Sequence, residues 1–300
     1  MPWKPPSRPV FCGTVHRMAF SCLCENPCLL PASAPATDQT RLMMLKKLLL
    51  ALCIGGLSLS ACAADNDAVP VAGSAVTPAA QQMVRQAIRS LAANVQVDSI
   101  EPAPMPGFYQ VIAAGQLLYV STDGKYAMHG DVLDLQSKHN LGDDAWARFR
   151  KAELAKVPAS ERIVFAPPNP KYTISVFTDV NCGFCRALHE HVAAFNKEGI
   201  AVEYLAWPRE GLVTTAGRPT PTYTEMVSVW CAKDRKAAFT AAKEGHAPAP
   251  ATCTNPVKDQ FNLGVKLGVN GTPAIYGPDG RVLGGYVTPE QLLQALKRGG

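Results

Sequence analysis

A C-x-x-C motif between a predicted strand and a predicted helix constrains the fold of this chain more than any other feature. Residues 172–177 are rich in β-branched and aromatic side chains, which predicts a strand. From Cys182 the apolar residues recur at three- and four-residue spacing until Gly199, which predicts a helix. Residues 200–207 predict the next strand. Together these segments predict a βαβ unit with Cys182-Gly183-Phe184-Cys185 at the turn into its helix.

The position of this motif predicts redox chemistry. Only a thiolate attacks a disulfide, and the backbone N–H groups and macrodipole at a helix N-terminus favour that anion. We therefore expect Cys182 to be the exposed nucleophile and Cys185 to be the buried thiol that resolves the mixed disulfide. Gly183 allows close approach of the chain, and Phe184 offers an apolar contact beside the sulfur. A purely structural Cys182–Cys185 disulfide is disfavoured, because closing so small a ring removes little entropy from the unfolded chain and strains the bond.

Charge and composition exclude other classes of protein. Hydrophobic residues make up 47% of the chain and charged residues 18%, which is typical of a globular protein. Most of the net charge of +5 lies in residues 1–62, which hold six Lys or Arg residues against two acidic ones. The remainder is nearly neutral and offers no electrostatic footprint for DNA or RNA, so we expect no nucleic-acid partner.

A secretory signal peptide explains the basic N-terminal part. Lys46 and Lys47 precede an apolar run over residues 48–59, and small residues follow it. The predicted segments are a non-native upstream extension over residues 1–42, a signal peptide over 43–63 and a flexible mature N-terminus over 64–76.

Two products of signal-peptide cleavage are compatible with the sequence. Residues 59–62 resemble a bacterial lipobox, which would leave Cys62 lipidated and the protein tethered to a membrane. The same small residues also suit an ordinary signal peptidase. We favour soluble release over anchoring.

Removal of the leader reduces ten cysteines to four, and export implies an oxidising compartment. Of the three possible pairings, the spacing favours Cys182 with Cys185 as a redox pair and Cys231 with Cys253 as the second. A Cys231–Cys253 disulfide would close a loop of about 22 residues and should contribute about 3 kcal/mol to the stability of the folded chain. Cys182, Cys185 and His189 also have the spacing C-x₂-C-x₃-H, but Cys231 and Cys253 fit no usual zinc spacing. We therefore expect no metal and no cofactor, with His189 and His191 on the helix surface.

Local patterns predict further elements on both sides of the motif. Thr77 and Pro78 open a helix through about residue 93, with Met83, Ala87 and Leu91 on one face. Short strands are predicted over residues 108–113, 116–121 and 125–129, and a connecting helix over 143–156. Such a small α+β unit has little core and often completes itself by pairing with a copy.

Near the C-terminus, Gly271-Thr272-Pro273-Ala274 precedes a predicted strand over residues 274–276, where a proline is tolerated. Pro278-Asp279-Gly280 predicts a hairpin turn. Thr288 and Gln291 have capping-box spacing and predict the start of a last helix.

From about residue 79 to residue 297 the chain resembles the periplasmic disulfide isomerases of the DsbC/DsbG family, and most closely its DsbC branch. The matching segments are residues 100–104, 118–120, 123–125, 176–179, 182–185, 204–209, 229–234 and 267–274. Gly183 argues against the DsbG branch, whose members carry Pro after the first cysteine. The Gly-Phe pair between the cysteines departs from the Gly-Tyr of DsbC. This difference leaves the reaction type intact but can shift the reduction potential of the dithiol.

The resemblance implies a fold and a set of site residues. The implied domains are a cystatin-like α+β dimerisation domain over residues 77–138, a linker helix over 139–160 and a thioredoxin fold over 161–300 with a helical insertion at about 210–262. It also implies that the Thr272–Pro273 bond is cis and lies beside the dithiol, where its backbone pairs with extended substrate. Cys231–Cys253 matches the structural disulfide of the family's insertion.

The resemblance also implies a function in the periplasm. A homodimer would isomerise or reduce wrong disulfides in misfolded exported proteins and act as a chaperone, and a membrane thiol reductant of the DsbD type would keep its dithiol reduced. Three alternatives remain open: an oxidase or sulfenic-acid reductase of the same fold, a non-enzymatic holdase, and a zinc or copper chaperone.

Overall fold

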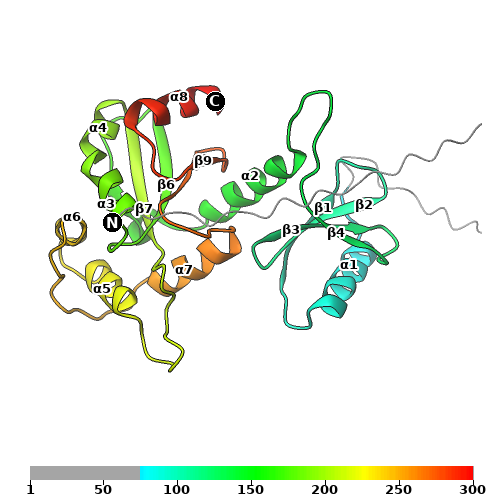
Figure 1. Cartoon of the computed structure of the whole chain (residues 1–300), viewed down its shortest axis with the longest axis horizontal. Helices are drawn as coiled ribbons and strands as arrows, with labels where there is room; N and C mark the ends of the chain where they lie inside the picture. Colours follow the sequence, from blue (N-terminus) through cyan, green and yellow to red (C-terminus); the bar gives the residue numbers. More distant parts are fainter. Residues whose placement is uncertain (1–74, 300) are drawn as a thin grey trace, which may run out of the picture. The chain divides into compact units, whose positions relative to one another are not determined.

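The structure is a computed structural model that describes residues 75–299 (Figure 1). The predicted upstream extension, the signal peptide, Cys62 and most of the predicted mature N-terminus lie outside the described residues. Within residues 75–299, none of the helices has both the length and the apolar character needed to cross a membrane.

The N-terminal part is one helix packed on a four-stranded antiparallel sheet. Its elements in chain order are α1 (Pro78–Leu91), β1 (Val97–Pro102), β2 (Phe108–Ala113), β3 (Gln116–Ser121) and β4 (Ala127–His129). The strands lie in the order β1-β2-β3-β4. Thr77 caps α1 as predicted, because its hydroxyl accepts from the Ala80 N–H at 3.2 Å. Val84 and Ile88 are the buried residues of α1, whereas Leu91, which the prediction placed on one face with Met83 and Ala87, is 69% exposed.

Strand β1 was not predicted. Only Val97 of its six residues is buried, so the strand lacks the clear alternation of buried and exposed side chains that marks a strand in sequence. Its register with β2 also shifts between Val97 and Ser99.

The connecting helix is α2 (Leu141–Leu154), close to the predicted range. Asn140 caps it by accepting from the Gly142 N–H at 3.0 Å. Phe149 and Leu154 of α2 belong to a hydrophobic cluster that also contains Leu267 and Tyr276. A single 3₁₀ turn, η1 (Ala159–Glu161), follows.

The C-terminal part is built on a five-stranded sheet in the order β5-β7-β6-β8-β9. These strands are β5 (Ile163–Phe165), β6 (Tyr172–Thr178), β7 (Ile200–Ala206), β8 (Ala274–Tyr276) and β9 (Val282–Gly284). Strands β6 and β7 are parallel and the other neighbouring pairs are antiparallel. The predicted βαβ unit is therefore confirmed. Its helix is split into α3 (Gly183–Glu190) and α4 (Val192–Lys197), because His191 leaves helical geometry at φ −92° and ψ 4°.

Helices inserted between β7 and β8 cover part of this sheet, and they are coloured yellow to orange in Figure 1. They are α5 (Pro221–Trp230), α6 (Arg235–Lys243) and α7 (Val257–Lys266). The Trp230 indole N–H and the Gln260 amide both donate to the Glu161 carbonyl, at 3.0 and 2.8 Å. The last helix, α8 (Pro289–Gly299), has the predicted capping box, since the Gln291 N–H donates to Thr288 Oγ1 and the Thr288 N–H donates to Gln291 Oε1.

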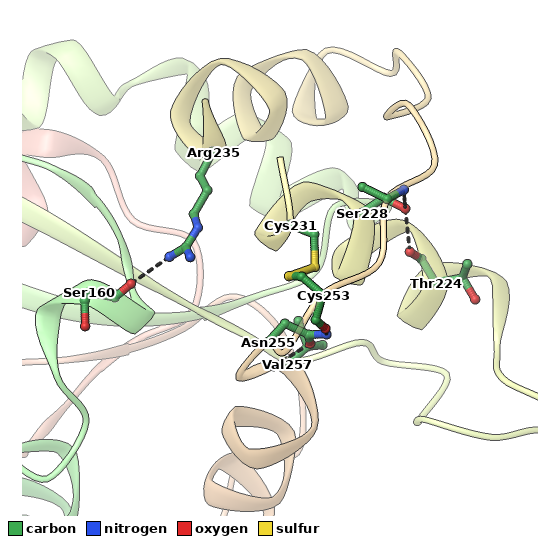
Figure 2. Close-up of a disulfide and its surroundings, with 9 residues drawn as sticks. Ser160, Thr224, Ser228, Cys231, Arg235, Cys253, Asn255 and Val257 are labelled. Atoms are coloured by element: carbon green, nitrogen blue, oxygen red, sulfur yellow. Dashed lines mark hydrogen bonds between the residues drawn. A yellow bond between two sulfur atoms is a disulfide. The ribbon is translucent and has the colours of Figure 1, made fainter. Parts of the chain in front are cut away.

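A disulfide joins Cys231, at the end of α5, to Cys253, in the segment before α7, with a Cα–Cα distance of 5.7 Å (Figure 2). Beside it, Arg235 of α6 donates to the Ser160 carbonyl at 2.6 Å, and the Ser228 hydroxyl donates to the Thr224 carbonyl within α5. The inserted helices are thus tied to one another and to the segment that precedes the sheet.

Candidate active site

The dithiol lies where β6 ends and α3 begins. Cys182 is the N-cap residue of α3, with extended backbone at φ −83° and ψ 121°, and Cys185 lies in the first turn. Both are free thiols in this structure. The unpaired N–H groups of the first helical turn therefore lie next to Cys182, as the motif predicts.

A segment 90 residues further along the chain contacts Cys182. Its thiol donates to the Thr272 carbonyl at 3.2 Å, and the Thr272–Pro273 peptide bond is cis. The antiparallel pairing of β6 with β8, which places Phe177 opposite Ala274, brings the two segments together.

The predicted exposure of Cys182 is wrong for this structure. The residue is only 2% exposed, because it lies against the Thr272–Pro273 segment. Phe184, by contrast, is 68% exposed, and its ring centroid lies 6.4 Å from that of Tyr286. The apolar surface next to the dithiol is therefore formed by Phe184 and Tyr286.

The pKa of Cys182 is lowered from its ordinary value. Burial acts to raise this pKa, but the polar groups of Thr272 and Cys185 and the positive charge of Arg209 outweigh it. The Thr272 hydroxyl oxygen is buried and has no hydrogen-bond partner among the described residues, so this hydroxyl is available to donate to a thiolate. Cys182 is thus prepared to ionise.

Cys185 has the opposite character. It is fully buried, as predicted, and burial raises the pKa of its thiol. The charge of Lys243, the Asp179 N–H and the hydroxyls of Thr178 and Thr272 act in the opposite direction without overcoming burial. Cys182 is therefore the thiol that ionises more readily and attacks first, whereas Cys185 stays protonated until the mixed disulfide has formed.

Two charged residues beside the dithiol were not predicted to belong to the active site. Asp179 is 1% exposed, and its carboxylate accepts from the backbone N–H of Asn181 at 2.7 Å and of Arg209 at 2.8 Å. Lys243, at the end of α6, is 4% exposed and donates to Thr178 Oγ1 at 2.7 Å and to the Asp179 carbonyl at 2.8 Å. Asp179 has a sequence signal as a capping residue before the motif, whereas Lys243 has none.

His189 is not a surface residue, so this prediction is wrong. It is 5% exposed, with Nδ1 3.1 Å from the Tyr204 hydroxyl and Nε2 3.0 Å from the Thr240 hydroxyl. Burial, and then the charge of Lys243, lower the pKa of His189 to about 4. The helix turns this face toward Phe165 and Phe239, which apolar periodicity alone did not reveal.

His191 is half-buried at the break between α3 and α4. Across residues 75–299, no three His, Cys, Asp or Glu residues are grouped so that they could hold a metal ion.

Comparisons with known proteins agree with this geometry. A family model described as a thioredoxin-like domain matches residues 160–300, and one described as the disulfide bond isomerase protein N-terminal domain matches residues 61–143. Both predicted fold classes are thereby confirmed.

Several curated proteins named "Thiol:disulfide interchange protein DsbC" match most of the chain. The protein from Salmonella typhimurium is 37% identical over 73% of this chain and 88% of its own length. The protein from Escherichia coli K12 is 37% identical over 68% of this chain and 82% of its own, and that from Dickeya dadantii is 34% identical over 74% and 89%. The chain belongs to the DsbC family of thiol:disulfide interchange proteins.

Proposed function

We propose that Cys182 and Cys185 carry the thiol–disulfide interchange of this chain, and that the reaction isomerises or reduces non-native disulfides. The observation that supports this most directly is the free Cys182 thiol at the N-terminus of α3, 3.2 Å from the carbonyl of the cis-bonded Thr272. A thiol of lowered pKa next to one of raised pKa is the arrangement that a two-step exchange requires.

The reaction follows from these acidities. The Cys182 thiolate attacks one sulfur of a substrate disulfide, forms a mixed disulfide and releases the other substrate sulfur as a thiolate. A second substrate thiolate that attacks the mixed disulfide returns the enzyme unchanged and gives isomerisation. Attack by Cys185 instead forms Cys182–Cys185 and gives a reduced substrate with an oxidised enzyme.

The surroundings of the dithiol suit a polypeptide substrate. The backbone of Thr272 and Pro273 lies beside the attacking sulfur, and we assign it the pairing with an extended substrate segment. Exposed Phe184 and Tyr286 supply an apolar contact, and Gly183 has no heavy atom within 4 Å of the position that a Cβ would take. The structural disulfide Cys231–Cys253 holds the insertion.

The biological setting is part of the same proposal. Residues 77–138 form a dimerisation domain, 139–160 a linker and 161–300 the catalytic domain, with an insertion at about 210–262. The protein works in the periplasm as a homodimer on misfolded exported proteins, with a chaperone activity of its own. A membrane thiol reductant of the DsbD type keeps the dithiol reduced, because only a reduced Cys182 starts the exchange.

Refolding of a scrambled protein with several disulfides tests the assignment. We expect the wild-type protein to restore the native activity of the scrambled substrate, and Cys182→Ser to be inactive, because a hydroxyl cannot form the mixed disulfide. Cys185→Ser should retain isomerisation and accumulate a mixed disulfide that is visible by mass spectrometry. Equal refolding rates for the wild type and Cys182→Ser would rule out the proposal.

A further inference from the structure

The segment between β7 and α5 forms a short hairpin that extends away from the sheet (Figure 1). Val213 and Pro219 form its antiparallel bridge. Two backbone hydrogen bonds flank the bridge, from the Thr214 N–H to the Arg218 carbonyl at 2.7 Å and from the Thr220 N–H to the Leu212 carbonyl at 3.1 Å. An isolated two-stranded hairpin is only marginally stable in water, so contacts at its base are needed to hold it.

The base of this hairpin is tied to the loop that carries the nucleophile. Thr222 is 3% exposed, and its hydroxyl donates to the Glu210 carboxylate at 3.2 Å and accepts from the Asn181 amide at 3.3 Å. Asn181 directly precedes Cys182. The residue before Glu210 also donates its backbone N–H to the buried carboxylate of Asp179, at 2.8 Å. The hairpin therefore continues the surface that surrounds Cys182.

The two edges of the hairpin offer different backbone groups. Val213 and Pro219 form a pair with hydrogen bonds on either side of it, and the two residues of such a pair direct their own backbone groups outward. Within residues 75–299, neither the N–H nor the carbonyl of Val213 is hydrogen-bonded. Pro219 has no N–H, so only the Val213 edge offers both a donor and an acceptor to an added strand.

The side chains of the hairpin suit a polypeptide of no particular charge. Val213 is 58% exposed, and Arg218 is the only charged residue between positions 211 and 224. Proteins usually protect a free strand edge with charged residues, a bulge or proline. The Pro219 edge has this protection, whereas the Val213 edge presents a β-branched apolar side chain and free backbone groups. This asymmetry indicates that the Val213 edge is kept open for a ligand.

We propose that the Val213 edge binds an extended segment of the substrate polypeptide by strand addition while Cys182 attacks the disulfide of that substrate. The Val213 N–H donates to a carbonyl of the substrate, and the Val213 carbonyl accepts from a substrate N–H. The inference rests on the proposed function of Cys182 and Cys185. The occupant is the substrate because the contacts at the base of the hairpin lead through Thr222 and Asn181 to the nucleophile.

The geometry also defines the class of substrate. Val213 follows Glu210 by three residues, which cover about 10 Å of extended chain. A substrate must therefore continue for several extended residues beyond its cysteine before it reaches the hairpin. Unfolded proteins and long peptides meet this condition, whereas a short peptide reacts at Cys182 without touching the Val213 edge.

Saturation kinetics with a short and a long peptide disulfide test the proposal. The peptides have about five and about twenty uncharged residues, and in each a central cysteine is joined to a chromophoric thiol that leaves on attack by Cys182. We expect the long peptide to half-saturate the wild-type enzyme at a lower concentration than the short one. Val213→Pro removes the outward N–H and should raise this concentration about fivefold for the long peptide, with the limiting rate and the short peptide unchanged.

Two control variants separate strand addition from other effects of the substitution. Val213→Thr keeps the N–H, the carbonyl and the β-branched shape, and it should bind the long peptide as the wild type does. Leu135→Pro, at a residue that is 86% exposed and whose N–H donates to no acceptor within residues 75–299, should change neither peptide.

Several outcomes would overturn the inference. They are equal half-saturation of the wild type by the two peptides, an unchanged value for the long peptide in Val213→Pro, and an equal rise for both peptides in that variant. A lower mass of Val213→Pro in light scattering would assign the edge to a second copy of the chain and would also overturn it. If the wild-type enzyme releases the thiol from neither peptide, the proposed function of the dithiol fails instead.

Discussion

At the residue scale, the two thiols differ because different parts of the chain contact them. Cys182 contacts the backbone of Thr272, and the charge of Arg209 lowers its pKa. Cys185 is buried near the end of β6, and the charge of Lys243 acts to lower its pKa. Cys182 and Thr272 are 90 residues apart in the sequence. Near Cys185, Lys243 donates to the carbonyl of Asp179, which is 64 residues away in the sequence. The reactivity of the motif is therefore a property of the tertiary structure and not of the four motif residues alone.

His189 gives a pH dependence at this scale. Burial lowers its pKa from 6.5 to about 4, so between these pH values the unfolded state binds more protons than the folded state. Its contribution to stability is complete above pH 6.5 and is lost as the pH falls toward 4. Between pH 7 and pH 4.5 we expect this site to reduce the free energy of unfolding by about 2 kcal/mol.

Urea unfolding at the two pH values measures this effect. His189→Gln retains a donor and an acceptor for Tyr204 and Thr240 but does not titrate, so it should lose less stability on acidification than the wild type. His191→Gln, two residues further along, is the control and should behave as the wild type. Equal losses in the wild type and His189→Gln would show that His189 is protonated in the folded state at pH 4.5.

At the element scale, the disulfide matters because it closes the part of the insertion that carries α6. It links the end of α5 to the segment before α7 across 22 residues (Figure 2). Helix α6, which ends at Lys243, lies between these two cysteines in the sequence. Cross-linking lowers the entropy of the unfolded chain, which favours the folded insertion.

Replacement of both Cys231 and Cys253 by Ala should lower the free energy of unfolding by about 3 kcal/mol. The double substitution avoids leaving one free thiol that would exchange with the active site. Guanidinium unfolding of the oxidised wild type and of the variant gives the difference directly. A loss below about 1 kcal/mol would mean that the insertion is held by contacts such as Trp230 and Gln260 on Glu161.

Elements with strong local patterns could be predicted from the sequence, and elements defined by their neighbours could not. The strand before the motif, the Thr77 cap and the Thr288–Gln291 capping box depend on residues a few positions apart. Strands β1 and β5 are short or mostly half-buried, and pairing with β2 and β7 determines them. The same limit applies to the site: the dithiol is a local motif, whereas Lys243 and Thr178 meet only after α6 packs at the end of β6.

At the scale of the whole molecule, the N-terminal sheet has a free edge. Within residues 75–299, strand β4 is the last strand in its sheet and pairs only with β3, and all three of its residues are exposed. Met128 is 42% exposed and the adjacent Tyr126 67%. An unpaired edge with apolar side chains is a template for another strand, and a two-fold symmetric pair of such edges forms an isologous dimer. We therefore assign the proposed homodimer contact to β4.

Met128→Lys tests this assignment, because it would bring a like charge from each copy of β4 into the proposed contact. Light scattering at micromolar concentration should give a dimer mass for the wild type and a monomer mass for Met128→Lys, with the dissociation constant raised at least about tenfold. Leu135→Lys, at a more exposed residue in the loop after β4, should remain a dimer. If Leu135→Lys dissociates and Met128→Lys does not, the contact lies in that loop. Alkylation of Cys182 should proceed at the same rate in both variants, because the residues that lower the pKa of Cys182 all lie beyond position 181.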